Sequence, residues 1–241
     1  MGRFSKKGSY RSEKEPIMTK EIPFAVEEAY NSLRTNLIFS LPEEKCKIIE
    51  VTSSAQNEGK SITAVNLAIA LAKNGEGVLL IDCDLRLPTV AKKMRVRQKP
   101  GLTNLLFGQN SMEEVIVHHP SGLDIITAGA LPPNPSEVLG SSKMSTVLEK
   151  LKERYDYVIL DVPPVGVVTD AAVLAPRVSG ILLVVRQGVA KHEGVGTAVN
   201  QLRLANGNII GFVLTGAKVT KKSYLHYNYN MLSRTGKNTG K

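Results

Sequence analysis

Three short stretches of this 241-residue chain place lysine, serine and aspartate at spacings that suit the binding of phosphate and a divalent cation. The first, "EVTSSAQNEGKSIT" (residues 50–63), is a β-branched run, a small polar loop and then Gly59-Lys60-Ser61. A phosphate-binding loop needs a strand, a turn whose backbone N–H groups converge on an anion, a lysine, and a helix start with a hydroxyl for Mg²⁺. The predicted nucleotide-binding residues are Ser54, Ala55, Gln56, Asn57, Glu58, Gly59, Lys60, Ser61 and Ile62.

Two positions of this loop depart from the usual pattern. Ser54 and Asn57 stand where glycines are common in phosphate-binding loops. Asparagine adopts positive φ more readily than other non-glycine residues, so we expect the turn to form. The alternative is an ordinary glycine turn, which the strand-to-helix setting disfavours.

The second stretch is "VLLIDCDLRLP", residues 78–88. An apolar strand ends in Asp82 and Asp84, with Arg86 just beyond, and alternation puts both aspartates on one side while Cys83 points away. Paired carboxylates repel unless a cation or proton lies between them, which favours a magnesium or phosphoryl site. The alternative is that these aspartates cap a helix.

The third stretch, "YVILDVPPV" (residues 157–165), is a buried strand that ends in Asp161. An aspartate at such a strand end holds Mg²⁺ in phosphate-loop enzymes. One aspartate is weak evidence and can be a simple turn residue. A metal-binding role for Asp161 is therefore favoured only because the other two motifs are also present.

These motifs need a sheet whose strands end at one edge, and the chain alternates short β-branched runs with helical stretches. The predicted strands are Ile48–Thr52, Val78–Asp82, Leu123–Thr127, Tyr157–Asp161, Ile181–Val185 and Ile209–Leu214. The predicted helices are an amphipathic one from Val26 to near Leu41, then Ser61–Lys73, Ser142–Arg154, Thr169–Ala175 and Lys191–Ala205. Strands that are apolar on both faces indicate an α/β fold with a doubly wound, mostly parallel sheet and helices on both faces. Residues 129–142 are rich in proline and predict a loop with an extended start.

The two ends of the chain differ from its centre in charge. The formal net charge is +9, and basic residues crowd residues 1–20 and 218–241. We predict a disordered basic arm over 1–20, one domain over 21–215 and a flexible tail over 216–241 that contains Tyr224, Tyr227 and Tyr229. The basic residues are not interspersed with aromatic side chains that could stack on bases, and they do not lie on a predicted helix that could contact base edges. We therefore expect no nucleic-acid partner.

Cysteine content and hydropathy predict the compartment. Only Cys46 and Cys83 are present, which gives no disulfide framework and favours a reducing compartment. The chain has neither an 18-residue apolar stretch nor a hydrophobic signal core. We expect a cytoplasmic protein.

In their order and spacing, the "EGKS" loop, "LLIDCDLRLP", "LPPNPSEVL" and "VILDVPP" resemble the bacterial tyrosine kinases, cytoplasmic CpsD/CapB-like autokinases of capsule and exopolysaccharide production. The resemblance spans roughly residues 25–230. It implies that the protein is a P-loop ATP-dependent tyrosine kinase whose substrate is its own tail, Tyr224, Tyr227 and Tyr229.

The resemblance also implies roles for the motif residues. Lys60 would bind the β- and γ-phosphates of ATP, and Ser61 would bind Mg²⁺. Asp82 would help to hold the metal and receive the tyrosine proton, while Asp84 and Asp161 would complete the metal's surroundings.

Partners follow from the same resemblance. Similar proteins carry Glu-x-x-Arg-x-x-Arg on a helix that joins subunits into a ring, and the matching positions here are Glu28, Asn31 and Arg34. Since the middle arginine is missing, one charge-assisted pair is lost. The family works with a Wzz-like or CapA-like membrane chain-length regulator, here expected as a separate chain that recruits the kinase to the inner face of the membrane, and with a tyrosine phosphatase.

Two other functions stay open. A MinD/ParA-like ATPase shares the fold but carries a second lysine early in the loop, where this chain has Ala55, and it has no tail tyrosine cluster. A nucleotide-gated scaffold without tyrosine phosphorylation is the other alternative. The sequence does not identify the polysaccharide, the partner, external substrates or the first tyrosine modified.

Overall fold

The central sheet has seven strands in the order β3-β4-β2-β5-β1-β6-β7, and all neighbours pair in parallel except β3 with β4. The computed structural model describes residues 17–19, 22–41 and 43–217. The strands are β1 (Lys47–Ser53), β2 (Val78–Asp82), β3 (Ile116–His118), β4 (Asp124–Ile126), β5 (Tyr157–Asp161), β6 (Gly180–Arg186) and β7 (Ile209–Thr215). This topology confirms the predicted doubly wound α/β fold.

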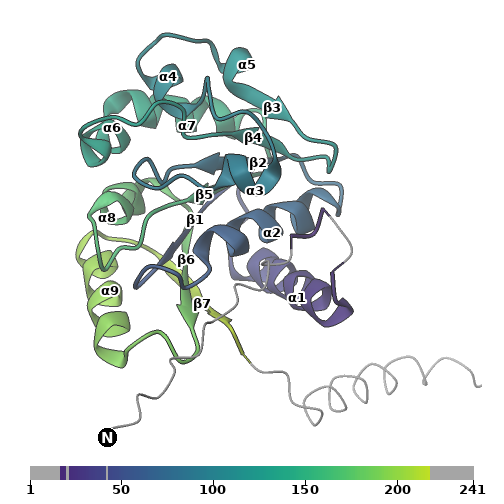
Figure 1. Cartoon of the computed structure of the whole chain (residues 1–241), viewed down its shortest axis with the longest axis vertical. Helices are drawn as coiled ribbons and strands as arrows, with labels where there is room; N and C mark the ends of the chain where they lie inside the picture. Colours follow the sequence, from purple (N-terminus) through teal and green to yellow (C-terminus); the bar gives the residue numbers. More distant parts are fainter. Residues whose placement is uncertain (1–16, 20–21, 42, 218–241) are drawn as a thin grey trace, which may run out of the picture.

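Helices cover both faces of the sheet, with α1 and α2 on one side and α8 and α9 on the other (Figure 1). The helices are α1 (Phe24–Ser40), α2 (Lys60–Ala72), α3 (Val90–Met94), α4 (Leu102–Leu106), α5 (Met112–Val115), α6 (Pro135–Gly140), α7 (Ser142–Lys152), α8 (Asp170–Leu174) and α9 (His192–Leu204), with a 3₁₀ turn at Ala175–Arg177. None of the helices in the described ranges combines the length and apolar character that crossing a bilayer requires.

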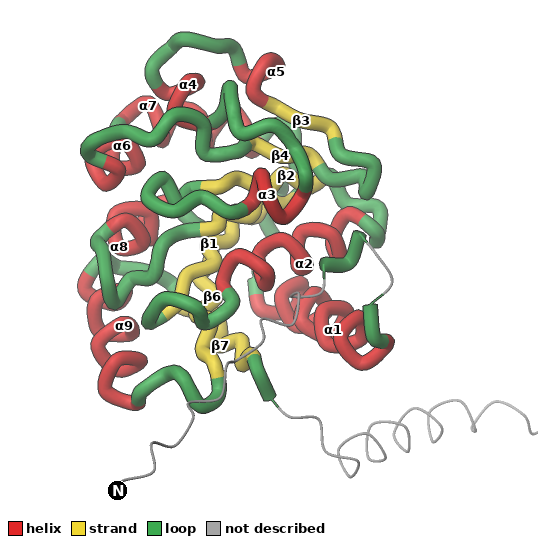
Figure 2. Tube along the Cα trace, viewed as in Figure 1, coloured by secondary structure: helices red, strands yellow, loops and turns green. Residues whose placement is uncertain are grey.

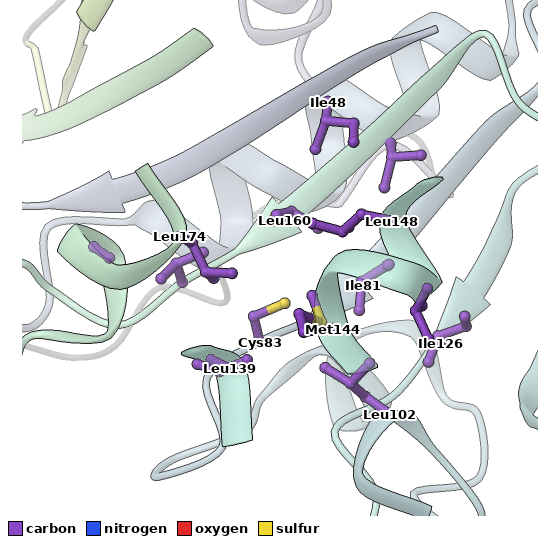
Figure 3. Close-up of a cluster of buried hydrophobic side chains, with 14 of the residues drawn as sticks. Ile48, Ile81, Cys83, Leu102, Ile126, Leu139, Met144, Leu148, Leu160 and Leu174 are labelled. Carbon is purple, nitrogen blue, oxygen red and sulfur yellow. The ribbon is translucent and has the colours of Figure 1, made fainter. Parts of the chain in front are cut away.

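Strand residues alternate between two hydrophobic clusters, one on each face. On β1, Ile49 and Val51 pack in the cluster that includes α1, α2 and α3, whereas Ile48 packs in the cluster that includes α4 to α9. Figure 3 shows the second cluster, in which Cys83 lies with Leu139 of α6. Both faces of the central strands are therefore buried, as their unbroken apolar runs predict.

Loops that leave β1, β2 and β5 gather at one edge of the sheet (Figure 2). Because these three strands are parallel neighbours, their carboxyl ends lie side by side. In the pairing of β2 with β5, Asp82 is directly opposite Asp161. The fold thus brings together the three motifs that the sequence singles out.

Two sequence predictions need correction. The proline-rich stretch 129–142 contains helix α6, because Pro135 occupies its first turn and Leu139 buries its side chain in the core. Residues 1–20 were predicted as a disordered arm, but Met18 is buried and its backbone N–H donates to Asn66 Oδ1 at 2.9 Å. The rest of that arm, residues 1–16 and 20, and the tail over 218–241 lie outside the described residues.

Candidate functional site

The loop between β1 and α2 has the backbone of a phosphate-binding turn. Asn57 has φ of 63° and Gly59, which immediately precedes α2, has φ of 92°. Asn57 therefore takes the left-handed conformation that the sequence predicts for it. The 13-residue helix α2 begins at Lys60, so its unpaired N–H groups and positive dipole end face the loop.

Contacts inside the loop and behind it fix its shape. The buried carboxylate of Glu58 accepts hydrogen bonds from the Ser54 hydroxyl, 2.9 Å from each oxygen, and from the Ala55 N–H at 2.9 Å. Behind the loop, the Thr215 hydroxyl at the end of β7 donates to the Glu58 carbonyl at 2.6 Å. The sequence predicts the loop but not this bracing, since Thr215 is distant in the chain.

The ammonium of Lys60 is held between two carboxylates from the neighbouring strand ends. Its Nζ lies 2.8 Å from Asp84 Oδ2 and 3.0 Å from Asp161 Oδ1. Burial alone would lower the pKa of Lys60, but attraction to Asp161 and Asp84 outweighs it and raises the pKa above the usual value. Lys60 thus stays charged at the carboxyl edge of the sheet.

Asp82 has a different environment from Asp84. Its fully buried carboxylate accepts hydrogen bonds from the N–H of Asp84 at 3.2 Å through Oδ1, and from Thr89 at 3.1 Å and Val90 at 3.0 Å through Oδ2. Burial and repulsion by Asp161 raise the pKa of Asp82 to about 8. Asp82 therefore closes the loop after β2 and caps the start of α3. For this residue, the alternative that the aspartates cap a helix describes its contacts.

One carboxylate oxygen in the site has no partner among the described residues. Asp161 Oδ2 is buried and makes no hydrogen bond there, although Asp161 Oδ1 contacts Lys60. The Ser61 hydroxyl contacts the same lysine, at 3.2 Å from Lys60 Nζ. Within the described ranges no group of three or more acidic, histidine or cysteine side chains forms a ready metal site. A hydroxyl and one or two carboxylates nevertheless suit Mg²⁺, which usually takes its remaining ligands from water and substrate phosphates.

A cleft of about 330 Å³ opens above this group. Its lining combines the phosphate loop and Lys60 with the charged residues Asp84, Arg86 and Lys93 and with the apolar residues Pro163, Pro164, Val167 and Val168. A lining with both charged and apolar side chains suits a molecule with a phosphate chain and an aromatic part.

The predicted interface residues on α1 take part in local contacts. Glu28 Oε1 accepts a hydrogen bond from Asn31 Nδ2 at 3.0 Å, and Arg34 Nη1 donates to the Ala70 carbonyl of α2 at 3.1 Å. Arg34 therefore helps to attach α1 to α2. The predicted acceptors Tyr224, Tyr227 and Tyr229 lie outside the described residues.

Residues 46–209 match the family model described as an AAA domain. Tyrosine-protein kinase YwqD of Bacillus subtilis (strain 168) is 37% identical over 201 residues, which cover 83% of this chain and 85% of that protein. Putative tyrosine-protein kinase CapB of Staphylococcus aureus is 34% identical over 205 residues, covering 85% of this chain and 90% of that protein.

Solved structures of tyrosine kinases are also similar to this chain. The kinase domain of Escherichia coli tyrosine kinase ETK has a TM-score of 0.78 at 36% identity, covering 84% of this chain and 83% of that one. The chimerical protein CapA2B2 has a TM-score of 0.74 at 31% identity, covering 78% and 83%. The septum site-determining protein MinD of Pyrococcus horikoshii has a TM-score of 0.61 at 23% identity, covering 75% and 76%, which shows a shared fold alone.

Proposed function

Because this chain belongs to the family of bacterial tyrosine-protein kinases, we propose that it transfers the γ-phosphoryl group of Mg-ATP to Tyr224, Tyr227 and Tyr229 of its own tail. The observation that carries the proposal is the Lys60 ammonium, held between Asp84 and Asp161 in the cleft that the phosphate loop closes. Phosphoryl transfer depends mainly on positioning and on neutralising charge, and this arrangement supplies both.

Each polar group has a place in binding. Lys60 and the first N–H groups of α2 would bind the β- and γ-phosphates. Ser61 and Asp161 would hold Mg²⁺ directly or through water, with the unpartnered Asp161 Oδ2 as the ligand oxygen. A bound Mg²⁺ ion supplies charge neutralisation at the phosphate oxygens.

In the transfer, the phenol oxygen of a tail tyrosine forms a bond to the γ-phosphorus while the bond from that phosphorus to the β–γ bridging oxygen breaks. ADP leaves, and the phenolic proton passes to a carboxylate. The sequence predicts Asp82 as this acceptor, but Asp82 is fully buried and its oxygens accept backbone N–H groups. Asp84 lines the cleft, so we propose that Asp84 orients the phenol and that Asp82 positions the loop that carries it.

The start of the tail lies close to the active site. Thr215 contacts the phosphate loop, and Tyr224 follows nine residues later. Nine extended residues span at most ~30 Å, so the three tyrosines have the reach to enter the cleft of their own chain or of a neighbour. Phosphates added there carry negative charge that repels the acidic groups of the site.

Regulation follows the family pattern. We propose that the kinase is cytoplasmic, that a separate membrane chain-length regulator activates it at the inner face of the membrane, and that a tyrosine phosphatase opposes it. The similarity to the chimerical protein CapA2B2 supports a partner of this kind. Phosphorylation of the tail would then regulate capsular or exopolysaccharide polymerisation and export.

The test is to map phosphate on the tail of the wild type and of Lys60→Met. Each chain would be co-expressed with the cytoplasmic segment of the regulator, since a kinase without its activator can be silent. We expect phosphate on Tyr224, Tyr227 or Tyr229 in the wild type, and its loss in Lys60→Met. A Lys152→Met control, which removes an exposed lysine that pairs with Glu149 away from the cleft, should behave as the wild type.

ATP hydrolysis without tail phosphate, with a regulator shown to bind, would contradict the proposal. It would favour a MinD/ParA-like ATPase. Nucleotide binding with neither hydrolysis nor phosphate would favour a scaffold.

A further inference from the structure

Arg86 forms a two-pronged ion pair next to the active-site cleft. Its Nε donates to Asp170 Oδ2 at 2.9 Å and its Nη2 donates to Asp170 Oδ1 at 2.9 Å. The Asp170 side chain is 0% exposed, whereas that of Arg86 is 38% exposed and lines the cleft. A planar guanidinium held at two points by a buried carboxylate has a fixed orientation.

A third side chain completes the arrangement. The Ser136 hydroxyl lies 2.6 Å from Asp170 Oδ1, to which it donates, and it accepts from Arg86 Nη2 at 3.1 Å. Ser136 belongs to α6, inside the proline-rich segment to which the proposed function gives no role. Arg177 holds the far end of this helix, because its guanidinium donates to the carbonyls of Leu139 at 2.7 Å and Gly140 at 2.6 Å. Two segments distant in the chain from Arg86, one containing α6 and the other α8, thus fix one guanidinium.

The remaining edge of that guanidinium is its Nη1 group. Arginine has five N–H donors, and Asp170 and Ser136 engage only those on Nε and Nη2. Among the described residues, Nη1 has no hydrogen bond or ion pair. Lys60 and the phosphate loop line the same cleft as Arg86, so two cationic side chains border one space.

We propose that Asp170 and Ser136 are positioning residues that hold Arg86 so that its Nη1 edge contacts the terminal phosphate of bound ATP. This inference rests on the proposed function and adds a specific group to it. A fixed arginine acts where charge develops on the transferring phosphoryl oxygens, and arginines in this role raise phosphoryl-transfer rates by about 10³-fold or more. Arg86 is then a catalytic residue, and the proline-rich segment exists to orient it.

The competing explanation is that the ion pair only joins α6, α8 and the loop after β2. Arg86→Ala alone cannot separate the two, because it leaves a buried carboxylate without its partner and destabilises the fold. The double variant Arg86→Ala/Asp170→Asn removes that buried charge as well. Comparing the single variants with the double separates stability from catalysis.

We expect Arg86→Ala to lower the midpoint of urea unfolding and the double variant to recover most of it. The kcat for tail phosphorylation should fall by about 10²-fold or more in both. Asp170→Asn alone should lower kcat by a smaller factor, since Arg86 remains but is less constrained. Arg86→Lys should restore little, because one ammonium cannot engage Asp170 and a phosphate as the fork does. Recovery of phosphorylation together with stability in the double variant would overturn the proposal.

Binding provides a second readout that does not depend on turnover. Titration of the wild type and the double variant with ADP and with a non-hydrolysable ATP analogue, each with Mg²⁺, gives an affinity ratio. We expect the affinity for the ATP analogue, divided by the affinity for ADP, to fall about tenfold in the double variant, while the affinity for ADP is retained. An unchanged ratio, or an equal loss for both nucleotides, would contradict contact with the terminal phosphate. The comparison holds even if the wild type fails to phosphorylate its tail, so it separates this inference from the proposed function.

The matched control is Arg154→Ala. Arg154 also forms an arginine–carboxylate pair, 2.9 Å from Glu113, but both side chains are more than half exposed and lie outside the cleft. Its removal should leave the affinity ratio and kcat at wild-type values, since exposed pairs contribute little.

Discussion

Asp82 and Asp84 are two residues apart, and their carboxylates have different surroundings. Asp82 is fully buried and accepts hydrogen bonds from three backbone N–H groups, so its contacts serve the loop that follows β2. Asp84 accepts one backbone N–H, from Leu87, and directs its other oxygen at Lys60 in the cleft. At the scale of single residues, the first carboxylate supports structure and the second faces the chemistry.

This difference predicts that substitution of Asp82 mainly lowers stability, whereas the matched substitution of Asp84 mainly lowers kinase activity. Asp82→Asn should lower the free energy of unfolding by about 1–3 kcal/mol, because an NH₂ group replaces one of the two oxygens that accept backbone N–H groups. Asp84→Asn should cost less stability but reduce tail phosphorylation by about tenfold or more. Urea unfolding and initial rates, measured on both variants, give the comparison. Equal stability losses would contradict the assignment.

Glu50 is a buried carboxyl group that the proposed mechanism does not use. It lies in the centre of β1, is fully buried, and neither carboxylate oxygen has a hydrogen-bond partner within the described ranges. Burial raises the pKa of Glu50 well above its usual value of 4.5. The carboxyl therefore stays protonated in the folded chain while it ionises in the unfolded chain.

The sign of the pH effect follows from proton binding. Above about pH 4.5 the unfolded chain has lost the Glu50 proton that the folded chain keeps, so the free energy of unfolding should fall as pH rises. Glu50→Gln should remove this contribution, which reaches about 1.4 kcal/mol per pH unit. Urea unfolding of the wild type and of Glu50→Gln at pH 5 and pH 8 measures this pH dependence. A variant with the same slope as the wild type would show that Glu50 ionises in the folded chain.

The sequence anticipates residues that belong to local motifs and misses those whose partners are distant. Lys60, Asp84 and Asp161 follow from strand ends that a parallel sheet must bring together. The pairing of Arg86 with Asp170 joins positions 84 residues apart, and the contact of Thr215 with Glu58 joins positions 157 apart. Such contacts depend on the assembled fold, so no local pattern predicts them.

At the scale of elements, the phosphate loop is packed against the loop that follows β5. The Val165 N–H donates to the Ser53 carbonyl at 2.9 Å, and the Thr52 hydroxyl donates to the Pro163 carbonyl at 2.7 Å. The next turn approaches so closely that a Cβ built at Gly166 would lie 2.2 Å from the Ser54 carbonyl oxygen. Only glycine permits this approach.

Gly166→Ala should therefore displace one loop or the other. We expect nucleotide affinity to fall about tenfold and the free energy of unfolding to fall by about 1–3 kcal/mol, because the contact is with backbone that cannot rotate away. Calorimetric titration with ADP and urea unfolding measure both effects. Gly194→Ala is the matched control, since a Cβ there meets nothing within 4 Å. Wild-type affinity in Gly166→Ala would contradict coupling between the loops.

Central strands with unbroken apolar runs are predictable from the sequence, whereas the three-residue edge strand and the one-turn helices are not. Strands β2 and β5 begin and end at the residues that their apolar runs predict. The antiparallel edge strand β3 has three residues, and α3 and α4 have five each, so they are too short for a periodic pattern. Helix α3 starts where Asp82 accepts its first N–H groups, a contact made only in the folded chain.

At the scale of the whole molecule, α1 presents the surface proposed for self-association. Arg34 is engaged with the Ala70 carbonyl of α2, and among the described residues Glu28 pairs with the neutral Asn31 amide alone. Relatives with an arginine at the position of Asn31 would gain a charge-assisted contact there. We therefore expect the self-association that the sequence resemblance implies to be weaker in this chain.

Asn31→Arg should strengthen self-association. Sedimentation velocity over a range of protein concentrations should show larger species at lower concentrations than for the wild type. Asn36→Arg adds the same charge at an exposed position of α1 and is the control. Identical sedimentation of the two variants would contradict a role for position 31 in the interface.

The central claim is that this cleft passes the terminal phosphoryl group of ATP to the tail tyrosines. The most direct measurement uses ATP with heavy oxygen in its γ-phosphate and the activated wild-type chain, and follows by mass spectrometry where the labelled phosphoryl group goes. We expect the label on Tyr224, Tyr227 or Tyr229. Label found only in free inorganic phosphate, with an unmodified tail, would contradict it.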